Sequence, residues 1–361
     1  MNSFKNELMI NQNKIGTYHP VYFIADIAAN HDGDLERAKD LIYQVAENGG
    51  HAAKFQHFAA KTIVSDKGFR SLGSRQSHQA QWKKSVYEVY DDAALKVDWT
   101  PILKETCDKA GIDFFTSPYS FDLVDQVDCY VPAYKVGSGD ITWPEIIRYM
   151  AKKNKPMLIA SGASTLDEVD QAVNACLEFN NQLVLMQCNT NYTASLENFK
   201  FINLDVLKTY RAMYPEIILG LSDHTPGHAT VLGSIALGAR VIEKHFTDDN
   251  DRNGPDHPFS MNPQSWKDMV ERSRELEHAL GCGVKKVEDN EKETVILQRR
   301  SIRLSKDLPA GATITREYLE VLRPCPEDGL PPYHLDRVIG KKLTTDKTYG
   351  DHLKWSDLDL A

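Results

Sequence analysis

The chain has 361 residues and a mass of 40.8 kDa, with 42 Lys and Arg against 51 Asp and Glu, so its formal net charge is −9. This acidic balance argues against a nucleic-acid-binding protein, whose affinity depends on clustered positive charge that meets phosphate. Apolar residues make up 42% and charged residues 26% of the sequence, which is typical of soluble globular domains and excludes a largely disordered chain.

Six cysteines are spread along the chain, and no two of them form a C-x-x-C pair, so the sequence fits neither a disulfide scaffold nor a zinc ribbon. The first 14 residues are polar and lack the apolar run of a secretory leader. No stretch reaches the roughly 18 consecutive apolar residues that a membrane span needs. We therefore expect a cytoplasmic protein that binds neither membranes nor nucleic acid.

Short apolar runs alternate with longer amphipathic segments, which is the pattern of βα units around a parallel sheet. Eight strand candidates follow one another in the chain, at residues 21–25, 52–56, 113–116, 133–136, 156–160, 183–188, 217–221 and 241–246. Helical spacing of apolar residues appears between them, at residues 35–47, 146–152, 166–179 and 229–237. Eight strands that each lead into a helix predict a closed (β/α)8 TIM barrel of the α/β class.

Two other parts of the chain depart from the βα pattern. Residues 58–99 are polar and dotted with aromatic side chains, and we expect them to extend over the barrel mouth. After a last barrel helix at 264–280, the charged stretch 285–293 is typical of a linker. From residue 300 onward nine prolines and glycines interrupt the chain, which predicts a small, mostly-β domain. We therefore assign residues 1–281 to the barrel, 282–299 to a linker and 300–361 to the small domain.

Polar residues crowd at the predicted carboxyl ends of the strands, where the active site of a TIM barrel is built. His224 and His245 follow the neighbouring seventh and eighth strands, so their imidazoles can converge on one divalent ion whose shell oxygen donors complete. Two histidines without cysteine suit Mn²⁺, Mg²⁺, Co²⁺ or Fe²⁺ better than a closed zinc site. His31 has no such partner, so a ligand and a hydrogen-bonded core histidine both remain open for it.

Lysines and hydroxyls at the same strand ends predict an anionic ligand. Lys54 and Lys135 lie within strands, where a buried ammonium group needs a paired anion to stay charged. With three hydroxyl residues they suit a phosphate or carboxylate; these are Thr116, Ser138 and Ser161. The acid and base candidates near the mouth are Asp26, Asp140, Glu243 and Asp256.

Six short motifs closely resemble those of the sialic acid synthase family, which condenses phosphoenolpyruvate with a sugar of the N-acetylmannosamine type. They are Ala-Asn-His-Asp-Gly-Asp at 29–34, Ala-Lys-Phe-Gln at 53–56, Ala-Tyr-Lys-Val-Gly-Ser-Gly at 133–139, Gly-Leu-Ser-Asp-His-Thr at 220–225, Ile-Glu-Lys-His-Phe-Thr at 242–247 and Gly-Pro-Asp-His at 254–257. Residues 300–361 resemble the antifreeze-like (SAF) domain that follows the barrel in that family. The resemblance therefore covers nearly the whole chain.

The resemblance implies a function for each of these positions. His224 and His245 would hold a catalytic Mn²⁺-like ion, with Mg²⁺ or Co²⁺ as alternatives. The phosphoenolpyruvate site would consist of Lys54, Thr116, Lys135, Ser138, Ser161, Thr190 and Ser222, and the sugar site of Asp140, Tyr192, Asp256 and Arg323. The family forms a domain-swapped homodimer, so the partner subunit's SAF domain is expected to supply that arginine.

Two carboxylates depart from the family's pattern, because Asp26 and Asp140 stand where it usually has Glu. Each carboxylate is therefore drawn back by one methylene. We expect Asp26 to orient or deprotonate the water that adds to the substrate, while Lys54 and Lys135 balance the phosphate, so these three form the catalytic group. We expect Asp140 to face the sugar.

Several alternatives stay open. The acceptor can be N-acetylmannosamine, its 6-phosphate or a 2,4-diacetamido-6-deoxy sugar of the legionaminate type. The chain can also be a synthase of another 3-deoxy-ulosonic acid, which would use a different aldose. Less supported are a metal-dependent hydrolase on the same barrel, because the usual His-x-His of its first strand is absent, and a non-catalytic sugar binder, which needs no metal pair.

Overall fold

The computed structural model describes residues 4–72, 84–192 and 195–360. The chain divides into two compact units, residues 1–281 and residues 282–361. Each unit encloses hydrophobic side chains of its own.

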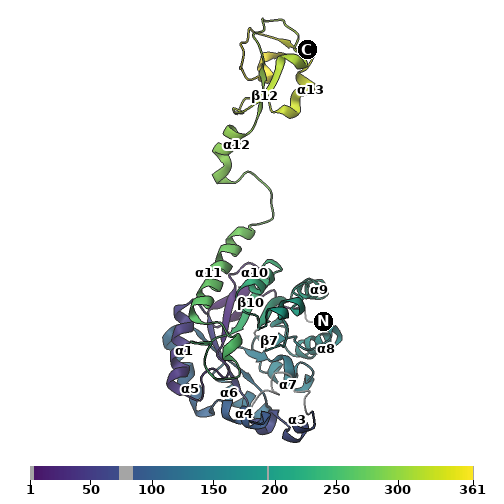
Figure 1. Cartoon of the computed structure of the whole chain (residues 1–361). Coiled ribbons are helices and arrows are strands. Elements are labelled where there is room, and N and C mark those ends of the chain that lie inside the picture. Colours follow the sequence, from purple (N-terminus) through teal and green to yellow (C-terminus); the bar gives the residue numbers. More distant parts are fainter. Residues whose placement is uncertain (1–3, 73–83, 193–194, 361) are drawn as a thin grey trace. The chain divides into compact units, whose positions relative to one another are not determined.

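The first unit is a TIM barrel, as predicted (Figure 1). Its eight parallel strands are hydrogen-bonded in the order β5-β4-β3-β10-β9-β8-β7-β6, and the end strands β5 and β6 also contact each other, so the sheet closes. The strands are β3 (Tyr22–Asp26), β4 (Ala52–His57), β5 (Asp113–Pro118), β6 (Tyr134–Val136), β7 (Met157–Ala160), β8 (Leu183–Cys188), β9 (Ile218–Asp223) and β10 (Ala239–His245). Each predicted strand agrees with the observed one to within two residues at either end.

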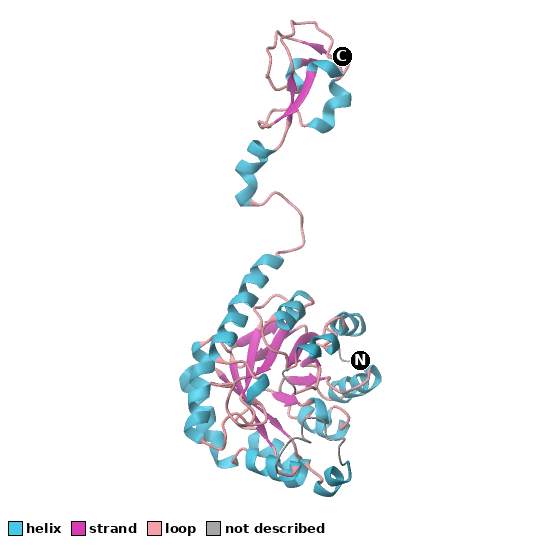
Figure 2. Cartoon of the chain, in the orientation of Figure 1, coloured by secondary structure: helices cyan, strands magenta, loops and turns pink. Residues whose placement is uncertain are grey.

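Helices surround these strands, and Figure 2 shows the strands enclosed by them. The helices are α1 (Leu35–Glu47), α5 (Thr100–Ala110), α6 (Phe121–Val127), α7 (Pro144–Ala151), α8 (Leu166–Leu177), α9 (Val206–Met213), α10 (Ala229–Ala236) and α11 (Pro263–Leu280). Capping side chains set several of their starts. Asp34 accepts hydrogen bonds from two N–H groups of the first turn of α1, and Thr165 and Glu168 form a reciprocal capping box on α8.

Strand alternation separates the two faces of the barrel sheet. In β4, for example, Ala53 and Phe55 pack outward against the helices, whereas Ala52 belongs to the cluster inside the barrel. Lys54 and Gln56 have the same parity as Ala52 and lie nearer the carboxyl end, so they face the mouth. Burial of each large apolar side chain stabilises the barrel by about 1.5–3 kcal/mol, and the mouth positions are thereby free to carry polar groups.

An N-terminal hairpin that the sequence did not predict closes the opposite end of the barrel. It consists of the antiparallel strands β1 (Glu7–Ile10) and β2 (Asn13–Gly16). Leu8, Ile10 and Ile15 join the apolar cluster inside the barrel. The turn is anchored by Asp113, which accepts hydrogen bonds from the side chains of Asn11, Asn13 and Tyr22; the first two distances are 2.5 and 2.9 Å.

The segment after β4 contains the short helices α2 (Ala60–Ile63), α3 (Asp66–Leu72) and α4 (Val86–Ala93). The predicted excursion over the mouth spans residues 58–99, of which 73–83 lie outside the described residues. The described part does reach the mouth, because Phe58, Ile63 and α4 contribute to the wall of the pocket there.

The second unit is small and built from short elements. They are α12 (Lys292–Gln298), β11 (Ser301–Leu304), β12 (Leu319–Leu322), α13 (Leu335–Val338), β13 (Lys342–Leu343) and β14 (Leu358–Asp359). Two antiparallel pairs, β11 with β12 and β13 with β14, enclose an apolar core around Ile302 and Leu353. The helix α12 lies within residues 282–299, which were expected to be a linker. In the described part of the whole chain, no helix is both long and apolar enough to cross a membrane.

Candidate active site

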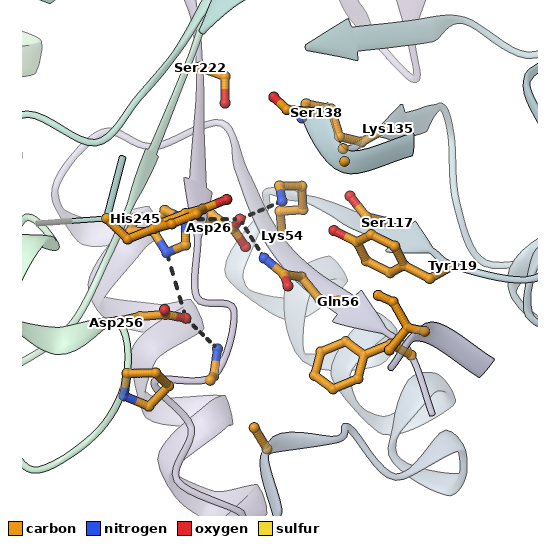
Figure 3. A pocket seen from close by; sticks show the side chains of 18 of the residues that line it. Asp26, Lys54, Gln56, Ser117, Tyr119, Lys135, Ser138, Ser222, His245 and Asp256 are labelled. Atoms are coloured by element: carbon orange, nitrogen blue, oxygen red, sulfur yellow. Dashed lines mark hydrogen bonds and ion pairs between the residues drawn. The ribbon is translucent and has the colours of Figure 1, made fainter. Parts of the chain in front are cut away.

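A pocket of about 390 Å³ opens at the carboxyl ends of the barrel strands. Most of the side chains predicted for the site line it; these are Asp26, Lys54, Lys135, Ser138, Asp140, Tyr192, Ser222, His224, Glu243, His245 and Asp256. Figure 3 shows Lys135 and Ser138 at one side of this pocket and Asp256 at the opposite side, with Lys54 and Asp26 between them. The pocket therefore has two chemically different ends.

The first end carries two buried ammonium groups held by two carboxylates. Lys54 Nζ lies 2.5 Å from Asp26 Oδ2 and 3.8 Å from Glu243 Oε1, and Lys135 Nζ lies 3.3 Å from the same Glu243 oxygen. All four side chains are at most 5% exposed. Burial opposes the charge on Lys54, but Asp26 and Glu243 outweigh it and raise the pKa of its ammonium group.

At this end, the Glu243 carboxylate has one oxygen that can still accept hydrogen bonds. Its Oε1 accepts a hydrogen bond from the Ser222 hydroxyl at 3.1 Å, whereas its Oε2 is buried and has no hydrogen-bond partner among the described residues. A buried polar atom without a partner is costly, and such atoms are common where a ligand or water completes the site. The lysines, Ser138 and Ser222 together present donors that suit an anionic substrate.

The two predicted metal histidines come together on adjacent strands. His224 follows β9 and His245 ends β10, and their ring centroids are 5.3 Å apart. His224 Nδ1 lies 3.0 Å from the Asn189 carbonyl, so donation from that nitrogen leaves Nε2 as a potential ligand. His245 Nδ1 is buried without a hydrogen-bond partner among the described residues and lies 3.9 Å from Asp256 Oδ2.

This donor set fits a divalent ion. Burial, with His224 and Lys54 nearby, holds the pKa of His245 well below its usual value, so its imidazole stays neutral as a metal ligand requires. Within the described ranges, no group of three or more His, Cys, Asp and Glu side chains is arranged to hold a metal. The two imidazoles would therefore share an ion with oxygen atoms of water or substrate.

The second end of the pocket is built from the Asp256 carboxylate and an aromatic ring. Asp256 accepts a hydrogen bond from the Ala29 N–H at 3.3 Å, and burial raises the pKa of its carboxyl group to about 6. Asp140, in the same turn as Ser138 at the lysine end, also lines the pocket, and burial raises the pKa of its carboxyl group to about 6. The Tyr192 ring contacts His224 edge-on, with ring centroids 4.5 Å apart.

Three predicted substrate residues do not line the pocket. The Thr116 hydroxyl lies on the helix-facing side of the sheet. It donates a hydrogen bond to the Phe55 carbonyl at 3.1 Å and lies 2.7 Å from His57 Nδ1. The Ser161 hydroxyl bonds the Met186 carbonyl and Tyr210. Thr190 is also absent from the lining. The hydroxyls of Thr116 and Ser161 therefore face away from the mouth, because their strand-end positions have the wrong parity. Thr190 lies against Gly162 together with Ser138, and its substrate role stays a prediction.

Two further predicted residues lie elsewhere. Arg323 belongs to the second unit, where it is exposed. His31 is buried outside the pocket wall, packs edge-on against Trp99 and accepts a hydrogen bond from the Gly33 N–H. Burial lowers the pKa of His31 to about 4, which matches the core-histidine alternative.

Several lining residues were missed by the sequence interpretation. Ser117 follows Thr116 and faces the pocket with a buried hydroxyl that has no partner among the described residues. Gln56 donates to Asp26 at 3.1 Å, and Tyr119 and Tyr90 add aromatic walls. Strand parity could have found Ser117, because Phe115 two residues earlier belongs to the interior cluster.

Comparisons with known proteins agree with this architecture. Residues 41–285 match the NeuB family, and residues 299–359 match the SAF domain. An N,N'-diacetyllegionaminic acid synthase from Legionella pneumophila is 33% identical over 95% of this chain and 96% of its own length. The human N-acetylneuraminate-9-phosphate synthase is 31% identical over 91% and 90%. A crystal structure of a spore coat polysaccharide biosynthesis protein from Bacillus subtilis, 27% identical, superimposes with a TM-score of 0.64 over 98% and 99%.

Both of these relatives are named as synthases, one of N,N'-diacetyllegionaminic acid and one of N-acetylneuraminate-9-phosphate. The barrel with its mouth of lysines, histidines and carboxylates, and the small domain that follows it, are those of a sugar-acid synthase. The chain belongs to the NeuB family of sialic-acid-type synthases and carries a C-terminal SAF domain.

Proposed function

We propose that this enzyme condenses phosphoenolpyruvate with an acetamido sugar aldehyde and releases phosphate, which yields a nonulosonic acid. The observation that carries the proposal is the pair of buried ammonium groups, Lys54 and Lys135, beside Ser138 and Ser222, in a pocket that also holds the imidazoles of His224 and His245. An anionic substrate suits the ammonium groups, and a polarised carbonyl suits the imidazoles.

The bonds in this reaction balance without an organic cofactor. C3 of phosphoenolpyruvate attacks the aldehyde carbon and forms the new C–C bond, and the aldehyde oxygen takes up a proton. Water adds to the cationic C2, and the C2–O bond to phosphate then breaks. The products are the sugar acid and inorganic phosphate. A divalent ion held by His224 and His245 would supply Lewis-acid polarisation of the aldehyde.

The chain's own residues have distinct tasks in this scheme. Lys54 and Lys135 offset the negative charge of the phosphate and carboxylate of phosphoenolpyruvate. When the substrate enters, its oxygens replace part of the contact that the two lysines make with Glu243. Asp26 lies between the two ends, because its Oδ2 is 2.5 Å from Lys54 Nζ and 3.6 Å from His245 Nε2. That position suits a group which orients or deprotonates the water that adds to C2.

The proposal is tested by phosphate release from phosphoenolpyruvate, assayed with Mn²⁺ and an acetamido sugar and with each of them omitted. We expect release only with all three present, and a sugar acid heavier than the acceptor by the pyruvate unit in the mass spectrum. EDTA should abolish release and Mn²⁺ should restore it. His245→Ala should lose at least about 100-fold in kcat, because it removes one of the two imidazoles that would hold the ion.

A matched variant separates the site from its surroundings. Thr116→Val changes a strand-end hydroxyl that faces the helices, and it should leave the KM for phosphoenolpyruvate within about twofold of the wild-type value. Ser117→Ala, at the next position, should raise that KM. Full activity of His245→Ala in metal-free buffer, or phosphate release without any acceptor, would contradict the proposed reaction.

A further inference from the structure

The loop between β10 and α11 brings Asp256 to the end of the pocket opposite the lysines (Figure 3). Among the described residues, the Asp256 carboxylate has one hydrogen bond, a long one of 3.3 Å from the Ala29 N–H. It lies 3.9 Å from His245 Nδ1, which is beyond hydrogen-bond distance. The position of this carboxylate therefore depends on how the loop on either side of it is held.

His257, the next residue in the loop, is fully buried and bridges two segments of the barrel mouth. Its Nε2 donates to Asp32 Oδ1 at 3.0 Å, because a carboxylate only accepts, and its Nδ1 lies 2.7 Å from the Thr247 hydroxyl. Asp32 lies in the segment after β3, and Thr247 in the segment after β10. These paired strands end in Asp26 and His245. The His257 ring thus ties the loop to two strands that carry predicted catalytic and metal residues.

Asp32 is itself fixed, so it can serve as an anchor for this ring. Its Oδ2 lies 3.3 Å from Arg37 Nε, and the Arg37 guanidinium also forms two hydrogen bonds with Asp248. The Arg37 side chain is 11% exposed. The hydrogen bond of Asp32 to His257 therefore belongs to a network whose other members are also restrained.

Gly254, two residues before Asp256, packs closely against the His257 ring. A Cβ added at Gly254 would lie 2.5 Å from His257 Cδ2 and 2.9 Å from its Nε2, so the ring would have to shift. Both ring nitrogens have partners, which oppose such a shift. The loop therefore contacts the ring before Asp256 and supplies the ring after it, so Asp256 is held between two fixed points.

The far end of the same turn is held by packing instead of hydrogen bonds. The turn spans His257–Phe259, and the Phe259 ring centroid lies 4.9 Å from that of His245 and 5.8 Å from that of His224. This contact does not use the His257 ring nitrogens. A change at those nitrogens should therefore affect Asp256 more than the two histidines.

We propose that His257, anchored by Asp32, is a positioning residue that holds the Asp256 carboxylate toward the acceptor sugar. His257 is not among the residues that line the pocket, so it can act only through its neighbours. This inference rests on the proposed condensation, in which Asp256 contacts the acceptor. A binding group that moves by about 1 Å can lower the rate by as much as 100-fold, which makes such positioning measurable.

The first experiment measures kcat/KM for the acceptor at saturating phosphoenolpyruvate, with the better of N-acetylmannosamine and 2,4-diacetamido-2,4,6-trideoxymannose. His257→Leu removes both ring hydrogen bonds and should lower this kcat/KM roughly 30-fold, while the KM for phosphoenolpyruvate stays within about twofold. His257→Gln keeps an N–H that can donate to Asp32, so it should recover most of the loss. Gly254→Ala leaves every polar group in place but displaces the ring, and it should lower the same kcat/KM.

A double-variant cycle tests whether His257 acts through Asp256. When Asp256→Ala has removed the carboxylate, adding His257→Leu should lower kcat/KM for the acceptor by less than about twofold more. A residue that only stabilises the fold would instead lower activity by the same factor in both backgrounds. Mn²⁺ affinity, followed by electron paramagnetic resonance, should stay within about threefold of wild type in His257→Gln.

His51→Gln is the matched control, because His51 also uses both ring nitrogens but precedes β4, at the opposite end of the barrel. Its Nδ1 accepts a hydrogen bond from the Phe23 N–H at 3.1 Å, and its Nε2 lies 3.4 Å from an Arg274 nitrogen. In urea unfolding this variant should lose stability, yet kcat/KM for the acceptor should stay within about twofold of the wild-type value.

Each outcome bears on the inference. Equal losses from His257→Leu with and without the Asp256 carboxylate overturn the positioning role but leave the condensation intact, as does a joint loss of Mn²⁺ and phosphoenolpyruvate affinity in His257→Gln. If His257→Leu does not fold, Gly254→Ala decides, because wild-type acceptor kinetics in that variant overturn the inference. If the wild type releases phosphate with no acceptor sugar, the proposed function itself is wrong and the inference fails with it.

Discussion

At the scale of single residues, ionisation of the Asp140 carboxyl group at the pocket lowers the stability of the fold. It lies in a 3-10 turn, Ser138–Asp140, directly after β6, and burial raises the pKa of its carboxyl group from the usual 3.8 to about 6. A carboxyl group with a higher pKa in the folded chain binds its proton more tightly there than in the unfolded chain. Its contribution to stability therefore falls as the pH rises from about 4 to about 6, and at pH 7 the ionised group destabilises the fold.

We expect Asp140→Asn to raise the free energy of unfolding at pH 7.5 by roughly 1–3 kcal/mol, because the amide cannot ionise in the buried position. Urea unfolding of the variant and the wild type measures this difference. At pH 4.5 the difference should shrink toward zero, since the wild-type carboxyl is then protonated. The variant should also turn over the acceptor more slowly, since it loses a charge in the wall of the pocket.

Asp91→Asn serves as the comparison, because Asp91 is exposed on α4 and should change the unfolding free energy by less than about 0.5 kcal/mol at either pH. An equal gain from Asp140→Asn at both pH values would show that the effect is one of packing rather than of charge.

At the scale of strands, most of the barrel could be predicted because its elements obey local rules. Runs of buried residues bounded by polar turns located all eight strands, and apolar spacing located helices such as α1 and α8. The hairpin of β1 and β2 could not be located in this way. Each of its strands has only four residues. Its three buried apolar side chains are buried only by packing into the end of the barrel, which is a tertiary contact that local sequence does not reveal.

The orientation of two predicted hydroxyls, those of Thr116 and Ser161, has one physical cause. A strand end offers consecutive polar residues, and only every second one faces the mouth. Thr116 and Ser161 were chosen by chemical type, and their hydroxyls face the helices instead. Lys54, with interior Ala52 two residues before it, and His245, with Glu243, have the correct parity. The chemical type of the strand-end residues was therefore enough to locate the site. It was not enough to tell which hydroxyl groups face the pocket.

The same alternation places a buried ion pair behind the two histidines. Asp223 immediately precedes His224 and Lys244 immediately precedes His245, and the two side chains are each 1% exposed with Nζ and Oδ2 2.5 Å apart. Asp223 also accepts hydrogen bonds from Thr225 and Thr230 at 2.8 and 2.7 Å. This pair ties the ends of β9 and β10 together where the imidazoles emerge, so we infer that it positions them.

We expect Lys244→Met to lower the free energy of unfolding by about 3–5 kcal/mol, because it leaves a buried carboxylate without its cation. The double variant Asp223→Asn with Lys244→Met should regain most of that loss, yet its affinity for Mn²⁺, followed by electron paramagnetic resonance, should stay roughly tenfold below wild type. The Mn²⁺ affinity distinguishes a positioning role of the ion pair from a stabilising one, because the double variant should regain stability without regaining Mn²⁺ affinity.

Asp113→Asn provides a control at the other end of the barrel. It weakens the hydrogen bonds that anchor the N-terminal hairpin and should lower stability without changing the affinity for Mn²⁺. Wild-type Mn²⁺ affinity in the double variant would mean that the ion pair merely stabilises the barrel and does not position the histidines.

At the scale of the whole molecule, the SAF domain carries Arg323, which can contribute either to the pocket of its own barrel or to that of a partner subunit. The barrel pocket carries the Asp256 carboxylate at the end opposite the lysines (Figure 3), and Arg323 is exposed on the second unit. A guanidinium group brought to such a pocket can bind hydroxyl and carboxylate oxygens while it excludes water. We propose, from the resemblance of Leu322-Arg323-Pro324 to the family's arginine, that the enzyme is a domain-swapped homodimer in which Arg323 acts on the partner's site.

Subunit mixing tests this arrangement. Arg323→Ala and His245→Ala chains should each be nearly inactive alone, and we expect the co-refolded mixture to recover up to about a quarter of the wild-type activity. If Arg323 acts in trans, each mixed dimer has one site with both defects and one site with neither. Random mixing makes half of the dimers mixed, and half of the sites in those dimers are intact, which gives the quarter. If Arg323 acts in cis, every site in a mixed dimer keeps one defect. Mixed dimers, verified by two affinity tags, that recover nothing would therefore exclude the shared site, and a monomer in sedimentation would exclude it without any mixing.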